Sequence, residues 1–374
     1  MKKEHILVIR FSALGDVAMV VPVVWSLAHQ YPDVRITMLS RGFARPFFEN
    51  LAPNVGFMEA DLKREYHGIK GLNALYRRLA AKQFTAVADL HNVLRSSFLR
   101  MRFNLNRYHV DHIDKHRKGR RHLTAFNNKE LVQQPTSFQN YSDVFKRLGY
   151  PVTIEFHSIF DNTPTGKGDL SLLPESLNSK LSTLNSKLST LNSKLSTLNS
   201  QLSTLIGIAP FAAHEGKIYP LQLMEQVVKL LTQQHPDARI LLFGRGEKEN
   251  QVFGEWCKQY PQCIFVSEHL RNIQQELILM SHLDVMLSMD SANMHMASLV
   301  ATPVVSVWGA THPYAGFLGW GQNEENILQV ELDCRPCSIY GKRPCRRGDM
   351  ACMNLIKPER IIEKIEQIIN PQNN

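Results

Sequence analysis

Two stretches of alternating apolar strands and amphipathic helices, one on each side of a seven-residue repeat, most strongly constrain how this 374-residue chain folds. In the first half we expect strands at Ile6–Ile9, Val34–Leu39 and Ala86–Leu90, and helices at Val17–Gln30, Phe43–Asn50 and Leu72–Lys82. In the second half we expect strands at Ile206–Pro210, Arg239–Phe243, Ile264–Val266, 283–287 and Val304–Trp308, and helices at Leu221–His235, Val252–Gln259 and Pro358–Ile369. Such alternation is typical of parallel sheets covered by helices. The sequence therefore predicts two α/β domains.

The repeat between the two halves has a different composition. The heptapeptide Leu-Asn-Ser-Lys-Leu-Ser-Thr begins at residue 177 and recurs at 184, 191 and, with one change, 198. Its leucines follow the four-and-three spacing of a heptad seam, but Ser, Thr and Asn are poor helix formers. We interpret it as an inserted linker; a coiled coil that dimerises the protein is the alternative. The expected organisation is a first domain at 1–165, the linker at 166–205, a second domain at 206–354 and a terminal helix and tail at 355–374.

Composition limits the class of protein and its partners. An apolar content of 44% is typical of a globular protein, and no apolar run approaches the roughly 20 residues that span a bilayer. The apolar run at Ile6–Ile9 is too short for a signal peptide, so we expect a cytoplasmic protein. The net charge of +9 favours an anionic partner: a phosphorylated substrate, a membrane surface or nucleic acid. Many of the basic residues fall between 95 and 121, which indicates either a solvated loop or a landing surface for an anionic acceptor.

Polar and small residues follow two strands of the second half. The strand at 283–287 leads to Asp290-Ser291-Ala292-Asn293 and a short helix that contains His295, and the next strand leads to Gly309-Ala310-Thr311-His312-Pro313. In open α/β sheets, ligands bind beyond the carboxyl ends of strands, and helix N-termini offer free N–H groups to phosphate. The pattern predicts a phosphate or nucleotide site. The alternative is that Asp290 only caps a helix and His295 is a core residue.

The first strand leads into a similar turn, Arg10-Phe11-Ser12-Ala13-Leu14-Gly15-Asp16-Val17, before a helix that contains Pro22. Gly15 permits a tight turn and a close approach of backbone to ligand. Asp16 lies at the start of the helix, beyond the carboxyl end of the strand. By itself, an aspartate in that place is most simply an N-cap.

Both turns resemble the signatures of glycosyltransferase family 9, the ADP-heptose:lipopolysaccharide heptosyltransferases. The first matches Arg-x-Ser-x-x-Gly-Asp followed by Pro, and the second matches Asp-Ser-x-x-x-His-Met-Ala with Gly-x-Thr-x-Pro, except that Ala292 stands where the family usually has Gly. The similarity covers about residues 1–165 and 206–370. It implies the GT-B architecture: two Rossmann-like domains facing a central cleft, with the acceptor bound by the first and the nucleotide sugar by the second.

The resemblance also implies roles for single residues. Inverting sugar transfer needs a base to deprotonate the acceptor hydroxyl. The resemblance implies that Asp16 is this base. The leaving diphosphate needs positive charge to stabilise it. The candidate is Lys217, in Glu215-Gly216-Lys217. The alternative is that Lys217 is an ordinary lysine on a surface loop. The expected donor-binding residues are Lys217, Glu247, Asp290, Ser291, Asn293, His295 and Thr311. The expected acceptor-binding residues are Ser12, Gly15, Arg95 and Arg120.

By the same resemblance, the reaction moves heptose from ADP-heptose to the Kdo/heptose inner core of a lipid A-linked acceptor. It would occur at the anionic cytoplasmic face of the inner membrane, with no cofactor, no catalytic metal and no nucleic-acid partner. Three alternatives stay open. One is another nucleotide-sugar donor, the second is a non-enzymatic protein that binds anions or nucleic acid, and the third is an inactive relic.

Four of the six cysteines gather near the C-terminus, at Cys334, Cys337, Cys345 and Cys352. The first two form a Cys-x-x-Cys pair, and four thiolates can hold a structural zinc. The wider spacing of the second two is unlike that of a zinc ribbon. Structural zinc and simple packing are therefore both open, and we assign the cysteines no catalytic role.

Overall fold

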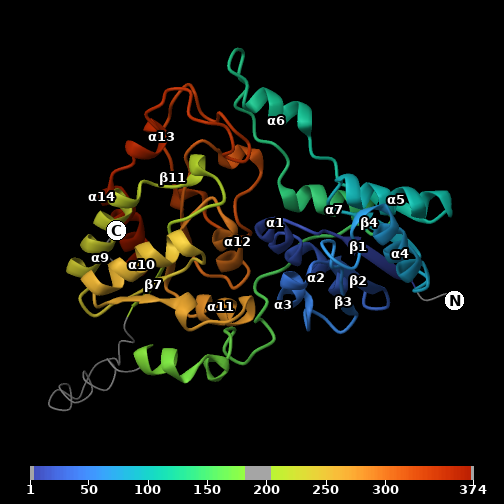
Figure 1. Cartoon of the computed structure of the whole chain (residues 1–374), viewed down its shortest axis with the longest axis horizontal. Coiled ribbons are helices and arrows are strands. Elements are labelled where there is room, and N and C mark those ends of the chain that lie inside the picture. Colours follow the sequence, from blue (N-terminus) through green and yellow to red (C-terminus); the bar gives the residue numbers. More distant parts are fainter. Residues whose placement is uncertain (1–3, 182–203, 372–374) are drawn as a thin grey trace. The chain divides into compact units, whose positions relative to one another are not determined.

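The computed structural model describes residues 4–181 and 204–371, and Figure 1 shows its elements coloured along the sequence. The chain divides into two compact units. Unit 1 comprises Met1–Gly119 and Gln133–Ile159, and unit 2 comprises Arg120–Val132 and Phe160–Asn374. The division near residue 159 lies close to the expected domain boundary at 165. The segment Arg120–Val132, however, packs with unit 2.

Unit 1 is built on a parallel sheet with the strand order β3-β2-β1-β4-β5 in the part of the chain that the structure describes. Its strands are β1 (His5–Ile9), β2 (Arg35–Ser40), β3 (Val55–Glu59), β4 (Ala86–Asp89) and β5 (His109–His112). Its helices include α1 (Leu14–Ala18), α2 (Val21–Gln30), α3 (Arg45–Phe48), α4 (Gly68–Ala80), α5 (Leu94–Leu105) and α7 (Ser137–Arg147), while α6 (Arg117–Leu123) crosses from unit 1 into unit 2.

The central strand β1 is buried along its whole length, which explains its unbroken apolar sequence. One side of the sheet packs against α4 and α5, whose buried side chains include Leu75 and Phe103. Because β1 pairs in parallel with β4 and Ile9 lies opposite Asp89, the carboxyl ends of these two strands are neighbours. The turn that contains Asp16 and the turn after Asp89 are thus brought together at one edge of the sheet.

Unit 2 repeats this plan with the strand order β11-β10-β9-β6-β7-β8 over its described residues. Its strands are β6 (Leu205–Ala209), β7 (Arg239–Leu242), β8 (Cys263–Phe265), β9 (Val285–Met289), β10 (Val304–Val307) and β11 (Ile327–Leu328). Its helices include α9 (Leu221–Gln234), α10 (Glu247–Gln259), α11 (Ile273–Met280), α12 (Ala292–Ser298), α13 (Ala351–Asn354) and α14 (Pro358–Ile369). The helices α9, α10 and α14 bury apolar side chains against one side of the sheet. Ala209 pairs with Ser288 and Met289 with Val307, so the exits of β6, β9 and β10 are adjacent.

The prediction of two α/β domains with parallel sheets is confirmed, but some element boundaries were wrong. The helix expected at Val17–Gln30 is two helices, α1 and α2, that meet before Pro22. Proline lacks an N–H and its ring clashes with the carbonyl four residues earlier, so one continuous helix cannot pass through it. Similarly, Pro46 lies in the first turn of α3, where the segment expected as one helix at Phe43–Asn50 changes from a 3-10 turn to an α-helix.

One expectation for the basic stretch at 95–121 was a solvated loop. The stretch instead contains α5, β5 and the start of α6. Strand β5 was missed because its four residues, His109–His112, show no apolar alternation at the edge of the sheet. Among the described residues, no helix has the length and apolar content needed to cross a bilayer. The repeat was expected to be a linker or a coiled coil; residues 175–181 are helical, and 182–203 lie outside the described residues.

Candidate active site

The exit of β1 holds Asp16 through an ion pair with Arg10. Arg10 Nη2 lies 2.7 Å from Asp16 Oδ2, and the same oxygen accepts the N–H of Ala13 at 3.1 Å. Asp16 is the third residue of α1, and Ala13 is the N-cap, so the aspartate is not an N-cap residue. Arg10 also donates to the carbonyl oxygens of Ser12 and Leu90, at 2.9 Å and 2.7 Å. A nearly buried guanidinium thereby fixes a carboxylate whose side chain is 30% exposed.

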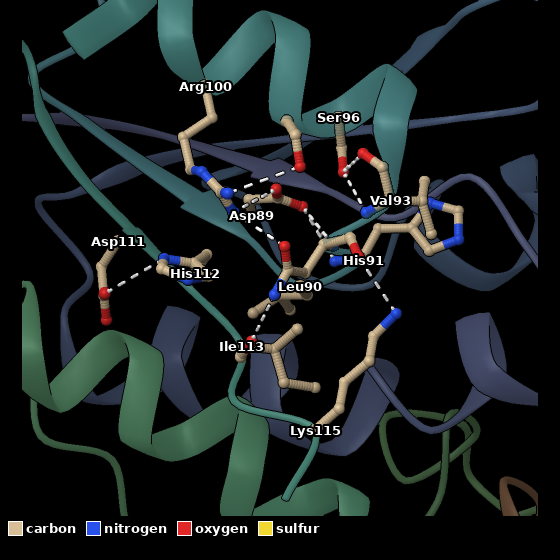
Figure 2. Close-up of polar contacts among 12 residues, drawn as sticks. Asp89, Leu90, His91, Val93, Ser96, Arg100, Asp111, His112, Ile113 and Lys115 are labelled. Atoms are coloured by element: carbon tan, nitrogen blue, oxygen red, sulfur yellow. Dashed lines mark hydrogen bonds and ion pairs between the residues drawn. The ribbon is translucent and has the colours of Figure 1, made fainter. Parts of the chain in front are cut away.

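The neighbouring turn after β4 is fixed by Asp89, which is fully buried. Its carboxylate accepts the N–H groups of His91 and Asn92, at 3.0 Å and 2.9 Å, and pairs with Arg100 at 3.0 Å. The contacts of Asp89 with His91 and Arg100 can be followed in Figure 2. Each carboxylate oxygen is therefore used to shape the backbone or to neutralise a cation. We interpret Asp89 as the residue that holds His91 in place.

His91 connects the two turns. Its Nδ1 accepts the N–H of Phe11 at 3.4 Å, and its Nε2 lies 3.5 Å from Ser12 Oγ. Burial, and then the nearby charges of Arg10 and Lys115, lower the pKa of His91 to about 3. A neutral ring that accepts at Nδ1 carries its proton on Nε2, which faces the Ser12 hydroxyl. Because His91 remains neutral near pH 7, it serves as a hydrogen-bonding partner and not as a cation.

Lys115, which lies beside these turns, was not predicted to be a site residue. Its Nζ donates to the carbonyl oxygen of Asn92 at 3.2 Å. Burial and then the positive charge of Arg10 lower its pKa. Tyr141 was also missed, and its hydroxyl donates to the backbone carbonyl of Asp16 at 3.2 Å. Both residues come from elements far along the chain, and neither belongs to a local motif.

The four expected acceptor-binding residues are divided between the two units. Gly15 is buried and Ser12 half-buried in the turn after β1, and Arg95 is exposed at the start of α5. Arg120 belongs to unit 2 instead. Its guanidinium lies 4.8 Å from the centre of the Phe317 ring, and its Nη1 donates to the Tyr340 hydroxyl at 3.1 Å.

In unit 2, the exits of β6 and β9 join through Lys217 and Asp290. Lys217 Nζ lies 2.8 Å from Asp290 Oδ2, and the two side chains are 14% and 3% exposed. Lys217 ends a short 3-10 turn (Glu215–Lys217) that follows β6, and Asp290 comes directly after β9. The pair was expected as two separate donor-binding residues, and the strand order places them in contact.

The exit of β10 completes this edge of the sheet. The Ala310 N–H donates to the Gly216 carbonyl at 2.8 Å, and a Cβ on Gly309 would lie 2.8 Å from that oxygen and 2.5 Å from Met353. Thr311 is fully buried, and its hydroxyl has no hydrogen-bond partner among the described residues. The Arg335 guanidinium donates to the carbonyls of Thr311 and Trp308, at 2.9 Å and 3.2 Å. Close backbone contact and one buried arginine therefore set the shape of this turn.

Three further residues expected to bind the donor lie on or beside α12. Ser291 is its N-cap and lies 3.2 Å from Ser288, measured between the hydroxyl oxygens. Asn293 is half-buried and His295 buried. Ala292, which departs from the usual family glycine, is the first residue of the helix, a conformation that any L-residue adopts.

Glu247 is exposed at the first position of α10, away from the Lys217–Asp290 pair in sequence and on the turn after β7. The carboxylates engaged in this turn are Glu249, which accepts the Arg245 N–H, and Glu276, which pairs with the Arg245 guanidinium at 2.9 Å. Burial raises the pKa of both carboxyl groups. They shape the turn that presents Glu247.

The four C-terminal cysteines are free thiols. Within residues 4–181 and 204–371, no three His, Cys, Asp or Glu side chains are placed to hold a metal ion. Burial raises the pKa of the Cys352 thiol to about 11 and also raises that of Cys337. The Cys334–Cys337 loop is held by Arg335, which lies between them and donates to carbonyl oxygens of the β10 exit.

Comparison with known proteins matches this chain to one family model. Residues 72–345 match glycosyltransferase family 9 (heptosyltransferase). Lipooligosaccharide heptosyltransferase 2 of Campylobacter jejuni is 23% identical over 171 residues, which are 45% of this chain and 52% of the relative. The match thus spans about half the length of this curated relative.

Solved structures share the fold over almost the full length. A family 9 glycosyltransferase from Veillonella parvula has a TM-score of 0.67 at 16% identity, covering 100% of this chain and 99% of that one. The ADP-heptose LPS heptosyltransferase II of E. coli has a TM-score of 0.60 at 18% identity, covering 99% and 100%. The two domains are accordingly of the GT-B class. The chain belongs to glycosyltransferase family 9, the heptosyltransferase family.

Proposed function

We propose that this chain is an inverting glycosyltransferase that moves heptose from ADP-heptose to the inner core of lipopolysaccharide. The observation that carries the proposal is the Lys217–Asp290 pair at the joined exits of β6 and β9, where open α/β sheets bind their ligands. Family membership and the ion-paired Asp16 support it. A family relative in E. coli was solved with ADP, which is consistent with this donor.

On the acceptor side, Asp16 is the proposed base. As the acceptor oxygen forms its bond to the anomeric carbon, the hydroxyl proton passes to the Asp16 carboxylate, and the bond from that carbon to the donor phosphate breaks. Arg10 holds the carboxylate at 2.7 Å and so restricts its orientation. The Ser12 hydroxyl, whose oxygen lies 3.5 Å from His91 Nε2, is the proposed hydrogen-bonding partner of the acceptor.

On the donor side, ADP leaves with the bonding electrons, and its diphosphate gains negative charge. Lys217 is the proposed counter-charge, acting in a site where it is only 14% exposed and therefore weakly screened by water. Asp290 holds the ammonium group in place before the donor arrives. The buried Thr311 hydroxyl lies on the adjoining exit and is a candidate hydrogen-bonding partner for the donor. We propose that the reaction needs no metal and takes place at the cytoplasmic face of the inner membrane.

The test is ADP release by the purified full-length chain with ADP-heptose and a Kdo-bearing lipid A acceptor, with and without EDTA. Release that requires acceptor and resists EDTA is expected. Asp16→Asn should lower the rate by about 10²–10⁴-fold, the usual contribution of a general base. Asp33→Asn, which removes the same charge at an exposed position of unit 1, is the matched control and should leave the rate unchanged.

Three results would contradict parts of the proposal. Full activity in Asp16→Asn would remove Asp16 as the base. Inhibition by EDTA would show that a metal is required. Activity with another nucleotide sugar but not with ADP-heptose would keep the site and change the donor.

A further inference from the structure

A large cavity lies within unit 2, beside the donor site. Its volume is about 1100 Å³, and its walls come from the segment Arg120–Val132, the loop after β6 and the loop that carries the four cysteines. Gly216 and Ala310 line it, whereas Lys217 and Asp290 do not. The cavity therefore shares a wall with the donor site without containing its charged pair. Its volume is at the upper end of what ligand sites reach and leaves room for several sugar rings.

The lining of this cavity is strongly cationic. The basic side chains are Lys129, Arg335, Lys342, Arg343, Arg346 and Arg347, and the acidic ones are Glu215, Glu331 and Asp333. Arg335 donates hydrogen bonds to backbone carbonyl oxygens, and Arg347 forms an ion pair with Asp349, 2.9 Å away. Lys129 and Arg343 donate to backbone carbonyl oxygens, and the Arg346 guanidinium lies 4.8 Å from the centre of the Phe126 ring.

The basic side chains outnumber the three acidic ones in this lining, and the half-buried Lys129 is one of them. Its Nζ donates to the carbonyl oxygens of Asp333 and Arg335, both at 2.8 Å, and burial lowers its pKa. Burial, followed by the charges of Arg335 and Lys129, also lowers the pKa of His312 to about 4. A bound anion would neutralise this excess of charge, because a half-buried cation gains most from a counter-ion that is shielded from water.

We propose that this cavity is an anion-binding subsite for the phosphate or carboxylate groups of the acceptor glycan. This rests on the proposed function, because that function supplies an acidic glycan as the acceptor. The cavity shares a wall with the donor site, so a glycan held there has its sugar rings near the reacting diphosphate. Unit 2 then contributes to acceptor recognition as well as donor binding, through Lys129, Lys342 and Arg343.

The test is direct titration of the full-length chain, saturated with ADP, with the deacylated acceptor glycan that keeps its carboxylates and phosphates. Lys342→Gln/Arg343→Gln changes two exposed cations and should not affect folding; Lys129→Gln probes the half-buried one. Both are expected to weaken glycan binding by about tenfold or more. The control is Lys258→Gln, an exposed charge of unit 2 outside the cavity, with unchanged binding. Dephosphorylated glycan distinguishes phosphate from carboxylate as the bound group.

A second readout locates the glycan. Cys337 and Cys345 line the cavity and are half-buried, so the glycan should slow their alkylation by iodoacetamide when ADP is already bound. Unchanged glycan affinity in Lys342→Gln/Arg343→Gln would overturn the subsite. An equal loss of ADP affinity would also overturn it, since the cavity would then be part of the donor site. Absence of heptose transfer with glycan binding that still depends on these cations would overturn the proposed function alone.

Discussion

At the scale of single residues, the Lys217–Asp290 pair combines a structural and a functional role. Both side chains are largely withdrawn from water, so removing one leaves an uncompensated charge. We expect Lys217→Met to lower the free energy of unfolding by about 3 kcal/mol. Lys217→Met/Asp290→Asn should recover most of this loss, because neither charge then remains buried, but should not recover transferase activity. Urea denaturation and ADP release, measured on the same preparations, separate the two effects. Recovery of activity along with stability would exclude Lys217 as the counter-charge.

The pKa of His91 predicts a dependence of stability on pH. The folded-state pKa is about 3, below the usual value of 6.5, so the unfolded chain binds more protons between these values. Stability should therefore fall as the pH drops below 6.5. His91 alone should account for about 2 kcal/mol between pH 7 and pH 5. His91→Gln, which keeps a polar side chain but cannot titrate, should flatten the pH profile of the free energy of unfolding in this range. An unchanged slope would mean that other groups control acid stability.

At the scale of elements, the contact between the exits of β6 and β10 depends on two glycines. A Cβ on Gly309 would meet the Gly216 carbonyl at 2.8 Å and Met353 at 2.5 Å. We expect Gly309→Ala to destabilise the protein by about 1–3 kcal/mol, since packed backbone cannot give way easily. The matched control is Gly254→Ala in α10, where a Cβ meets nothing within 4 Å. That change should stabilise the helix by about 0.5–1 kcal/mol. Thermal unfolding of both variants tests the comparison, and equal effects would contradict it.

The basic residues between 95 and 121 also have to be considered element by element. On the sequence they form one run of positive charge, but they belong to different elements and have different partners. Arg100 of α5 pairs with buried Asp89, and Arg102 lies 4.9 Å from the centre of the Tyr76 ring. Arg120 belongs to unit 2 and packs on Phe317 of the same unit. Several of these cations therefore stabilise the fold through intramolecular contacts. The number of basic residues in the stretch overstates how many are available to bind an anionic ligand.

At the scale of the whole molecule, the repeat offers a test of how the chain tolerates an insertion. The entropic cost of closing a flexible connection varies only with the logarithm of its length. Removing one heptapeptide, residues 184–190, should change stability by less than about 0.5 kcal/mol and leave ADP release unchanged. If the repeat instead joins two chains, the deletion should shift the molar mass measured by light scattering. A large loss of activity at unchanged mass would contradict both interpretations.

The sequence by itself determined the two α/β domains, the strand exits and the identity of most candidate site residues. It could do so because buried parallel strands need continuous apolar runs, and because tight turns at their ends need glycine and small polar residues, as around Asp16 and Asp290. What only the tertiary structure decided is which of these residues touch. Strand order brings Lys217 to Asp290, and Arg10 reaches Asp16 across a local turn while also holding Leu90 of the next strand exit. The segment that contains Arg120 and Lys129 packs with unit 2, although the segments on either side of it belong to unit 1. Burial lowers the pKa of His91 and so keeps the ring neutral. Apart from the local Arg10–Asp16 pair, these outcomes depend on contacts between segments distant in sequence, which no local pattern of residues encodes.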